Sequence, residues 1–440
     1  MAGESVEKHL VGDDLVKLNK EHVFFSWSVQ NEVQPIPIES GEGIYYWDTS
    51  GRRYMDFSSQ LMSLNIGYQH PKVVKAIQEQ AGKLTVAHPN TAHEPKAVLG
   101  KMLSELAPGK LNKAFFTLGG SEANENAIKL ARMYTRKSKI FARYISYHGA
   151  TMGSITLSGD YRRPPVEPGI PGVVHFFDPY CYRCTFGHTP QTCHRECVTH
   201  LEEMILNEGP QTVAAVIMEG VTGSNGILVP PDDYWLRIRE ITKKYDVLLI
   251  SDEVMSGFGR TGRWFAVDNW GVEPDMMTLA KGMTCGYLPL GALMVSDEIA
   301  NYYNDKYLFL GLTYFGHPMS CATAIATINV YKDEHVMDNV QQQSVLLGER
   351  LEELKQKYTA VGDVRYIGLF SVIELVKDRQ TRERMGADVM NKIKTALTAE
   401  GLTTFVNKNM VFVCPPLIIT QQQLNDGLDI IDRAIGSISQ

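Results

Sequence analysis

The chain has 440 residues, of which 44% are hydrophobic and 21% are charged, and these values are typical of a globular protein with room for two domains and a large core. Its net charge of −7 offers no basic surface to nucleic acid, and no apolar run approaches the length of a membrane span. Residues 1–8 lack the apolar stretch of a secretory signal, so we expect a cytoplasmic protein with neither nucleic acid nor membrane as a partner.

The first patterned segment, residues 115–134, is predicted to form a strand, a glycine turn and a helix, because apolar residues recur at helical spacing after the turn. Gly119 and Gly120 let the backbone approach a ligand closely, and the helix start offers free N–H groups to a phosphate. Ser121 adds a hydroxyl group. A plain helix cap is the alternative interpretation, and a Walker A loop is excluded because no Lys-Ser/Thr pair follows at the required spacing.

An aromatic motif follows the apolar run of residues 140–145. Tyr147, His148 and Gly149 come at the predicted end of this strand. A tyrosine in that position can stack on a flat cofactor ring, and Gly149 leaves room beside it. The alternative is a tyrosine that belongs to the protein core.

Four of the seven cysteines lie in one segment with the spacing Cys-x2-Cys-x8-Cys-x3-Cys. This spacing suits a tetrahedral metal site, and thiolates select zinc or iron–sulfur clusters. Free thiols and a labile disulfide within the first pair are the alternatives. We therefore consider a structural zinc site formed by Cys181, Cys184, Cys193 and Cys197.

Two later segments each end an apolar run on one charged group. Residues 248–251 lead to Asp252, and residues 276–280 lead to Lys281. Buried strands deliver such groups to a ligand crevice at their carboxyl ends. A buried carboxylate can keep a heterocyclic nitrogen protonated, and a partly desolvated lysine can form a Schiff base. Together with the phosphate turn and the aromatic motif, these residues predict a pyridoxal phosphate site, although a capping aspartate and a solvated lysine would explain either residue alone.

Strands and helices alternate from about residue 70 to residue 325, which predicts an α/β fold with a doubly wound, mainly parallel sheet. Beyond residue 330 the pattern changes to that of a smaller α+β unit, with helices or strands expected at residues 336–357, 370–376, 410–413 and 424–435. We therefore predict a large cofactor-binding domain of residues 66–325 and a small domain of residues 1–65 and 326–440.

In combination, these motifs resemble those of the class III aminotransferases, which belong to the fold-type I pyridoxal phosphate enzymes. The resemblance spans nearly the whole chain, from residue 41 to residue 416. The matching segments are residues 120–123, 147–149, 218–221, 251–254, 279–282 and 313–318.

The resemblance implies roles for the charged and aromatic residues. Lys281 would bond the cofactor covalently and then move a proton during catalysis. Asp252 would pair with the pyridine nitrogen. Val254 and Tyr147 would pack on opposite faces of the ring, and His148 would belong to the same cofactor site.

The resemblance also places the phosphate and a second subunit. Gly120 and Ser121 would hold the phosphate, and Glu219 would lie near the phenolic oxygen of the ring. Thr313 resembles the threonine that reaches the phosphate of the neighbouring subunit, which implies a homodimer with shared active sites.

Two charged residues that bind substrate in related branches are absent from this chain, and their absence limits the range of expected substrates. In the branches that use 4-aminobutyrate or ornithine, an arginine binds the acceptor's α-carboxylate and a glutamate can neutralise it. The corresponding positions carry Phe405 and Ser224, and their joint loss avoids an uncompensated buried charge. Ala150 stands where the 4-aminobutyrate type has a further arginine, so that substrate is disfavoured.

An anionic substrate still needs a cation. We expect Arg163 to supply it, with Arg162 as the alternative and Lys408 as a weaker candidate. The resemblance places Trp27 at the pocket wall on the amine side. A solvated arginine pair and a tryptophan at an interface are the alternative interpretations.

Residues 25–30 and 179–184 are similar to an ω-amino-acid branch that includes taurine transaminases. We therefore expect transamination of taurine, or of β-alanine or a similar ω-amino acid, with 2-oxoglutarate or pyruvate as acceptor. An aminomutase or isomerase on the same fold and an aminotransferase for uncharged amines remain open. A non-catalytic regulator is disfavoured because no basic DNA-binding domain is visible and both Lys281 and Asp252 are present.

Overall fold

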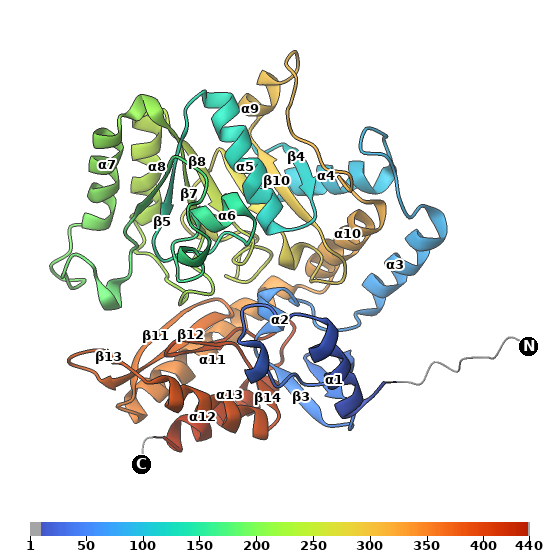
Figure 1. The fold of residues 1–440 in the computed structure, drawn as a ribbon, viewed down its shortest axis with the longest axis vertical. Coiled ribbons are helices and arrows are strands. Elements are labelled where there is room, and N and C mark those ends of the chain that lie inside the picture. The colour runs from blue at the N-terminus through green and yellow to red at the C-terminus, as the bar shows by residue number, and fades with distance from the viewer. Residues whose placement is uncertain (1–9, 439–440) are drawn as a thin grey trace, which may run out of the picture.

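The computed structural model describes residues 10–438, so the N-terminal residues 1–8, from which we predicted the absence of a secretory signal, lie outside it. Within the described chain a seven-stranded sheet forms the upper part of the molecule, and two smaller sheets lie below it (Figure 1). The strands of the upper sheet are, in spatial order, β4 (Lys113–Thr117), β10 (Gly291–Val295), β9 (Met276–Leu279), β8 (Leu248–Asp252), β7 (Val213–Glu219), β5 (Lys139–Arg143) and β6 (Val173–Phe176).

The upper sheet is mainly parallel. Of its seven described strands β10 alone is reversed, and it pairs antiparallel with both β4 and β9. The connection from β9 to β10 contains a short 3₁₀ turn, Lys281–Met283, instead of the crossover that a parallel neighbour needs. The predicted α/β fold with a doubly wound, mainly parallel sheet is confirmed.

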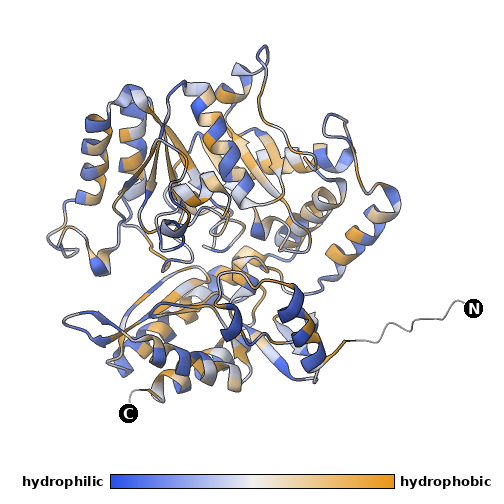
Figure 2. Ribbon diagram, in the orientation of Figure 1, coloured by the Kyte–Doolittle hydropathy of each residue, from blue (hydrophilic) through white to orange (hydrophobic). Residues whose placement is uncertain are grey.

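Helices cover both faces of the upper sheet. Ile250 of β8 belongs to a core cluster with residues of α5 (Gly120–Thr135) and α6 (Met152–Leu157), and the preceding Leu249 belongs to a cluster on the other face. That second cluster includes residues of α7 (Glu196–Glu208) and α8 (Tyr234–Lys244). Further helices around the sheet are α3 (Pro71–Lys83), α4 (Glu94–Leu106), α9 (Asp297–Tyr302) and α10 (Pro318–Asp333). Figure 2 shows the apolar residues concentrated on the strands and on the helix faces turned toward them.

The lower part draws on both ends of the chain. Its four-stranded sheet consists of β1 (Ile38–Glu42), β2 (Tyr45–Asp48), β3 (Arg53–Asp56) and β14 (Leu402–Thr403), and β14 pairs parallel with β3. Its five-stranded sheet consists of β11 (Val361–Ile367), β12 (Phe370–Asp378), β13 (Glu383–Arg384), β15 (Val406–Asn407) and β16 (Met410–Val413). The helices of this part are α1 (Gly12–His22), α11 (Val336–Lys357), α12 (Ala387–Ala399) and α13 (Gln421–Gly436). The elements expected after residue 330 are therefore present, and the domain boundaries at residues 65 and 325 stay a prediction.

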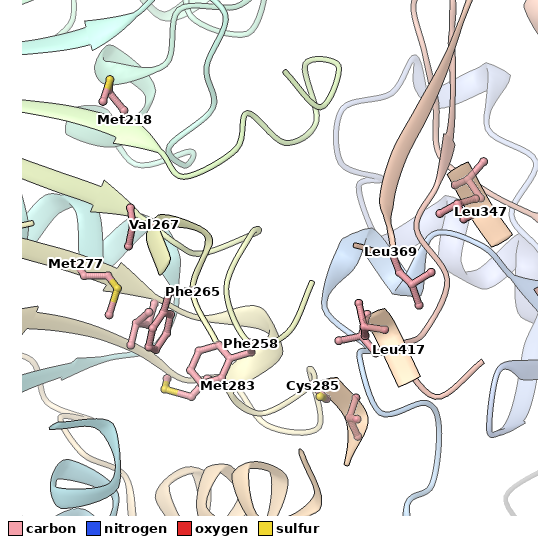
Figure 3. Close-up of a cluster of buried hydrophobic side chains, with 14 of the residues drawn as sticks. Met218, Phe258, Phe265, Val267, Met277, Met283, Cys285, Leu347, Leu369 and Leu417 are labelled. Carbon is pink, nitrogen blue, oxygen red and sulfur yellow. The ribbon is translucent and has the colours of Figure 1, made fainter. Parts of the chain in front are cut away.

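One buried core joins the two parts of the molecule. It extends from Met218 and Met277 of the upper sheet to Leu369 and Leu417 of the lower part (Figure 3). The side chain of Arg260 lies fully buried at this junction. Its guanidinium donates to the carbonyl oxygens of residues 369 and 415 and to the side chains of residues 59 and 65, at 2.6–3.2 Å. These bonds hold the lower part against the carboxyl ends of the upper strands.

No helix among residues 10–438 has both the length and the apolar character needed to cross a membrane.

Candidate active site

A cavity of about 460 Å³ lies at the carboxyl ends of the parallel strands. The ends of β7 and β8 contribute Glu219 and Asp252, and Lys281 follows β9 after one residue. Cofactor pockets of α/β sheets form at this edge, and their volumes fall in the same range. The sequence-predicted strand-end residues therefore meet in one cavity.

Lys281 projects into this cavity from a strained backbone. Its φ of 42° lies in the left-handed region that residues other than glycine rarely adopt. Burial lowers the pKa of the Lys281 amine to about 8, and the charge of Arg162 adds to this effect while Asp252 and Glu219 oppose it. A lysine with this pKa is partly neutral near physiological pH, as a nucleophilic amine must be.

Asp252 is held at the base of the cavity by three donors. His148 donates from Nδ1 to Oδ2 at 2.7 Å, Asn124 donates from Nδ2 to the same oxygen at 2.8 Å, and the Val254 N–H donates to Oδ1 at 3.0 Å. Asn124 is in turn oriented by Thr278, whose hydroxyl donates to the amide oxygen at 2.8 Å. The carboxylate is thereby fixed in one orientation and remains able to pair with a cationic group in the cavity.

Sequence reasoning missed Asn124. The residue lies four positions after Gly120, so both are on one face of α5. That spacing was the available signal, because the face that carries the phosphate turn at its start must also face the cavity one turn later.

Glu219 lies beside Lys281 and supports the aromatic motif. Its Oε1 accepts a hydrogen bond from the Tyr147 N–H at 3.0 Å, and its Oε2 accepts one from the Gly223 N–H at 2.7 Å. Burial is the main cause that raises the pKa of the Glu219 carboxyl, and the neighbouring Asp252 charge adds to it. The carboxyl thus fixes the loop that carries Tyr147 and leaves a polar edge on the cavity.

The start of α5, where the sequence predicts a phosphate site, lines the cavity with Gly120 and Ser121. Gly120 packs so closely that a Cβ atom on it would lie 2.7 Å from a methyl group of Val254. Gly149, with a φ of 137°, packs against Ser121 in the same way, and the Ser121 hydroxyl accepts from the N–H of residue 150 at 3.1 Å. The N–H groups at the helix start are therefore open to an anion.

The opposite wall of the cavity is a left-handed turn that the sequence did not predict. Residues 59–62 (α2, Ser59–Met62) have φ values between 46° and 64° although none of them is glycine. Asp56 accepts hydrogen bonds from the N–H groups of residues 58 and 60 at 2.9 and 3.1 Å and so stabilises the turn. Gln60 and Leu61 consequently line the cavity.

Arg162 is the cation beside the aromatic wall. Its guanidinium carbon lies 3.8 Å from the ring centroid of Tyr147 and 5.5 Å from that of Trp27, and the two rings meet edge to face at 6.3 Å. Asp160 pairs with the guanidinium, and the Ser224 hydroxyl accepts from Nη2 at 3.1 Å. Trp27 and Ser224 therefore both contact the guanidinium of Arg162, and Ser224 does so at the position where related branches carry a glutamate.

Arg163 does not reach the cavity. Its Nη1 pairs with Glu167 at 2.8 Å, and its charge contributes, after burial, to lowering the pKa of His175 on β6 to about 4. Neither Arg163 nor Arg162 is among the residues that line the cavity, so the expectation that Arg163 holds the substrate anion stays a prediction; the pairing of Arg163 with Glu167 and the contact of Arg162 with Tyr147 favour the alternative, Arg162. Adjacent residues in a loop point in different directions, and the sequence does not reveal which of them faces inward.

Thr313 lies outside the cavity of its own chain and is exposed. The segment around it also exposes large apolar side chains, with Tyr307 and Phe309 77% and 70% accessible. Exposed apolar clusters of this kind are typical of surfaces that contact another protein. The predicted role of Thr313 in a second subunit stays a prediction.

The structural zinc site is not supported. Among the described residues, no group of three or more His, Cys, Asp or Glu side chains could hold a metal ion. Cys197 is buried, and burial raises the pKa of its thiol to about 12, while the pKa of the Cys181 thiol is raised for the same main reason. Cys181, Cys184, Cys193 and Cys197 are free cysteines in this structure.

The cavity fits pyridoxal phosphate. It combines a lysine with a lowered pKa, a fixed carboxylate, an aromatic wall and a helix start shaped by Gly120 and Gly149. Each of these groups suits one part of the cofactor, the lysine its aldehyde, the carboxyl group its ring nitrogen and the helix start its phosphate, and all of them line one cavity. No other residue type at position 281 could supply the amine.

Known proteins with related chains support the same cofactor site. The model of the aminotransferase class-III family matches residues 27–435. A taurine:2-oxoglutarate aminotransferase from Bifidobacterium kashiwanohense, solved in complex with PLP and glutamate, is 42% identical with a TM-score of 0.95, covering 98% of this chain and 99% of its own. A putrescine–pyruvate aminotransferase of Pseudomonas aeruginosa is 35% identical over 93% of each chain, and a leucine/methionine racemase of Thermococcus litoralis is 35% identical over 92% of each chain.

Proposed function

Because the chain belongs to the class III aminotransferases, which use pyridoxal phosphate, we propose that it transfers the amino group of an ω-amino acid with a terminal anion to a keto acid. Taurine is the favoured donor and β-alanine is a second one, with 2-oxoglutarate or pyruvate as acceptor. The observation that carries this proposal is Arg162, whose guanidinium lies 3.8 Å from the Tyr147 ring centroid and acts electrostatically on Lys281.

The geometry suits a short donor with an anion at its far end. Arg162 keeps its Nε and Nη2 on Asp160 and Ser224, and no described residue accepts a hydrogen bond from its Nη1. A guanidinium binds a sulfonate or a carboxylate equally well. Phe405 occupies the position of the family's usual arginine and packs 4.9 Å from the ring of Phe412, and Arg162 is the cation that contacts the aromatic wall of the cavity.

Each residue of the cavity would have its own role in the proposed reaction. Lys281 would hold the cofactor, Asp252 its ring nitrogen, and the start of α5 with Ser121 its phosphate. When bound, pyridoxal phosphate supplies an electron sink and carries the amino group between donor and acceptor. The Lys281 amine, with its pKa near 8, takes a proton from the reacting carbon and returns it at the end of the transfer. The carboxyl group of Asp252, fixed by its three donors, would pair with the ring nitrogen, and Tyr147 would cover one face of the ring.

We also propose that the enzyme acts as a homodimer in which Thr313 completes the phosphate site of the partner subunit. Its exposure, its absence from the lining of its own cavity and the exposed apolar residues around it support this arrangement. A cytoplasmic location stays a prediction from the sequence.

A second candidate function is racemisation or amino-group migration on one substrate. The 35% identity with a leucine/methionine racemase supports this candidate. The two functions differ in what they consume. An aminotransferase uses up one keto acid for each donor, and a racemase uses none.

A panel of amines tests the proposal. The holoenzyme is mixed with taurine, β-alanine, L-leucine and a neutral amine of similar length, without any keto acid, and the cofactor absorbance is followed. We expect taurine and β-alanine to convert the cofactor stoichiometrically and at the highest rates. Conversion by the neutral amine alone, or interconversion of leucine enantiomers without loss of the cofactor absorbance, would contradict the proposal.

A further inference from the structure

A second cation, Lys408, lies near Arg162, whose guanidinium packs on Tyr147 in the wall of the cavity. Lys408 is at the tip of the hairpin between β15 and β16, and its Nζ lies 5.7 Å from the ring centroid of Tyr161. The guanidinium carbon of Arg162 lies 5.4 Å from the same ring. One exposed tyrosine ring therefore has Arg162 and Lys408 as its two cationic neighbours.

The hairpin is attached to the wall that holds Arg162. Asn407 donates from Nδ2 to the carbonyl oxygen of Ser224 at 2.8 Å, and the hydroxyl of Ser224 accepts from Arg162. Asn409, on the other side of Lys408, is buried and donates to the carbonyl oxygen of residue 375 at 2.6 Å. The position of the Lys408 backbone is thus set by bonds on both sides.

The backbone of Lys408 adopts a left-handed conformation that is unfavourable in free energy for a lysine. Its φ is 55°, and glycine or asparagine is the favoured residue at such a hairpin position. Its side chain is exposed and forms no ion pair within residues 10–438, and the same holds for the nearby Arg384. Within residues 10–438 the ring of Tyr161 is thus its neighbour, and no carboxylate forms an ion pair with it.

The local charges leave the surroundings of Lys408 positive. Partial desolvation lowers the pKa of Lys408, Arg384 and Arg162 contribute to the lowering, and Asp160 opposes it. Asp160 is already paired with Arg162. Three cations, Lys408, Arg384 and Arg162, therefore face one carboxylate, and the surplus of positive charge would attract an anion.

The two substrates of the proposed reaction differ in the anions they carry. Taurine and β-alanine have one anion, on the carbon next to the reacting carbon. A dicarboxylic keto acid such as 2-oxoglutarate has a carboxylate on the reacting carbon itself and a second one that lies a methylene farther out than the donor's anion. One cavity must bind both kinds of molecule in turn, and a single arginine cannot be placed ideally for both.

We propose that Lys408, with Arg384 behind it, binds the outer carboxylate of a dicarboxylic acceptor and so selects 2-oxoglutarate over pyruvate. This inference rests on the proposed function, in which Arg162 receives the single anion of the donor. Lys408 is then the residue that discriminates between acceptors, since pyruvate has no outer carboxylate.

The test uses two unreactive acids on the pyridoxal phosphate-loaded enzyme. Glutarate has the outer carboxylate and butyrate lacks it, and their dissociation constants are measured by calorimetry. Lys408→Asn keeps a residue that tolerates a positive φ, Lys408→Arg keeps the charge, and Lys394→Asn on α12 is the matched control at an exposed lysine.

We expect Lys408→Asn to weaken glutarate binding by about threefold to tenfold and to change butyrate binding by less than about twofold. Lys408→Arg should restore most of the glutarate affinity, and Lys394→Asn should alter neither acid. Unchanged glutarate binding, or equal weakening for both acids, would overturn the assignment.

Acceptor turnover separates this inference from the proposed function. Apoenzyme loaded with pyridoxamine phosphate is mixed with 2-oxoglutarate or with pyruvate. If the wild-type protein aminates neither keto acid, the proposed function fails whatever Lys408 does. If the wild type aminates 2-oxoglutarate and Lys408→Asn retains the same preference over pyruvate, the inference about Lys408 fails on its own.

Discussion

The guanidinium carbon of Arg162 lies 3.8 Å from the ring centroid of Tyr147. Tyr147 lines the cofactor cavity, so this contact joins a cation to the aromatic wall of the same cavity. A guanidinium over an aromatic face is attracted by the ring quadrupole and is restricted in its motion. The cation is therefore held at a fixed place relative to Lys281, whose pKa it helps to lower.

Replacing Lys281 tests its role as the residue that bonds the cofactor. Lys281→Ala should abolish the cofactor bond that borohydride reduces, as followed by absorbance and by mass spectrometry of the reduced protein. Turnover should fall by roughly a hundredfold to ten-thousandfold or more, because both the covalent attachment and the proton transfer are lost. A variant that still turned over repeatedly at the wild-type rate would remove Lys281 from this role.

The pKa of Lys281 predicts how cofactor capture depends on pH. The folded-state pKa is lowered from 10.5 to about 8, so the neutral amine is the minor form below pH 8 and the major form above it. Capture of pyridoxal phosphate by the apoenzyme, measured by stopped-flow absorbance, should therefore accelerate as the pH rises through about 8 and then level off. A rate that kept increasing toward pH 10.5 would indicate a lysine with an ordinary pKa.

The close approach of Gly120 to Val254 predicts a specific loss of cofactor affinity. Gly120→Ala would place a Cβ atom 2.7 Å from a Val254 methyl group and push the start of α5 outward. Pyridoxal phosphate affinity, measured by fluorescence titration, should fall by about tenfold, and Val254→Ala in the same chain should recover part of it. Gly100→Ala in α4 meets open space and is the control. Equal affinity for the Gly120 variant and the control would show that the contact can relax without cost.

Mixing two inactive variants tests whether the active site is shared. Lys281→Ala removes the amine from one subunit, and Thr313→Glu places a negative charge near the phosphate that we assign to the partner. In a mixed dimer one site has an intact Lys281 and an intact Thr313, so a random mixture should regain about a quarter of the wild-type activity. If Thr313 serves its own chain, neither site of the mixed dimer is intact and the mixture stays inactive.

The sequence predicted the strand-end residues well and the loop residues poorly. Asp252, Glu219 and Lys281 each end an apolar run, and a buried parallel strand carries its last polar residue to the same edge of the sheet as its neighbours. The left-handed turn at residues 59–62 has no glycine to mark it, because Asp56 stabilises it through hydrogen bonds formed only in the folded chain. Such local strain depends on tertiary contacts that a single sequence does not reveal.

The cysteine segment is the opposite case, because its regular spacing predicted a metal site and the described residues form none. The four residues have a spacing that suits zinc, yet Cys197 lies on a buried helix face and Cys193 accepts a hydrogen bond from the N–H of residue 195 at 3.3 Å. The four thiols do lie near one another, since Cys181 and Cys197 each interact electrostatically with other cysteines of the segment, but no described group of three or more side chains could hold a metal ion. The predicted zinc site is therefore not supported, because spacing along the chain does not fix the geometry that metal ligands need.

The most direct test of the proposed function compares donors in variants of the neighbouring arginines. Arg162→Met and Arg163→Met each remove one charge, and kcat/KM is measured for taurine and for a neutral amine of similar length at the donor half-reaction. A charge-assisted pair contributes about 1.5–3 kcal/mol, so Arg162→Met should lower kcat/KM for taurine by roughly tenfold to a hundredfold while the neutral amine loses much less. Arg163→Met, whose guanidinium pairs with Glu167, should affect both donors little. Equal losses for both donors in Arg162→Met, or a taurine-specific loss in Arg163→Met instead, would contradict the assignment of Arg162 to the donor's anion.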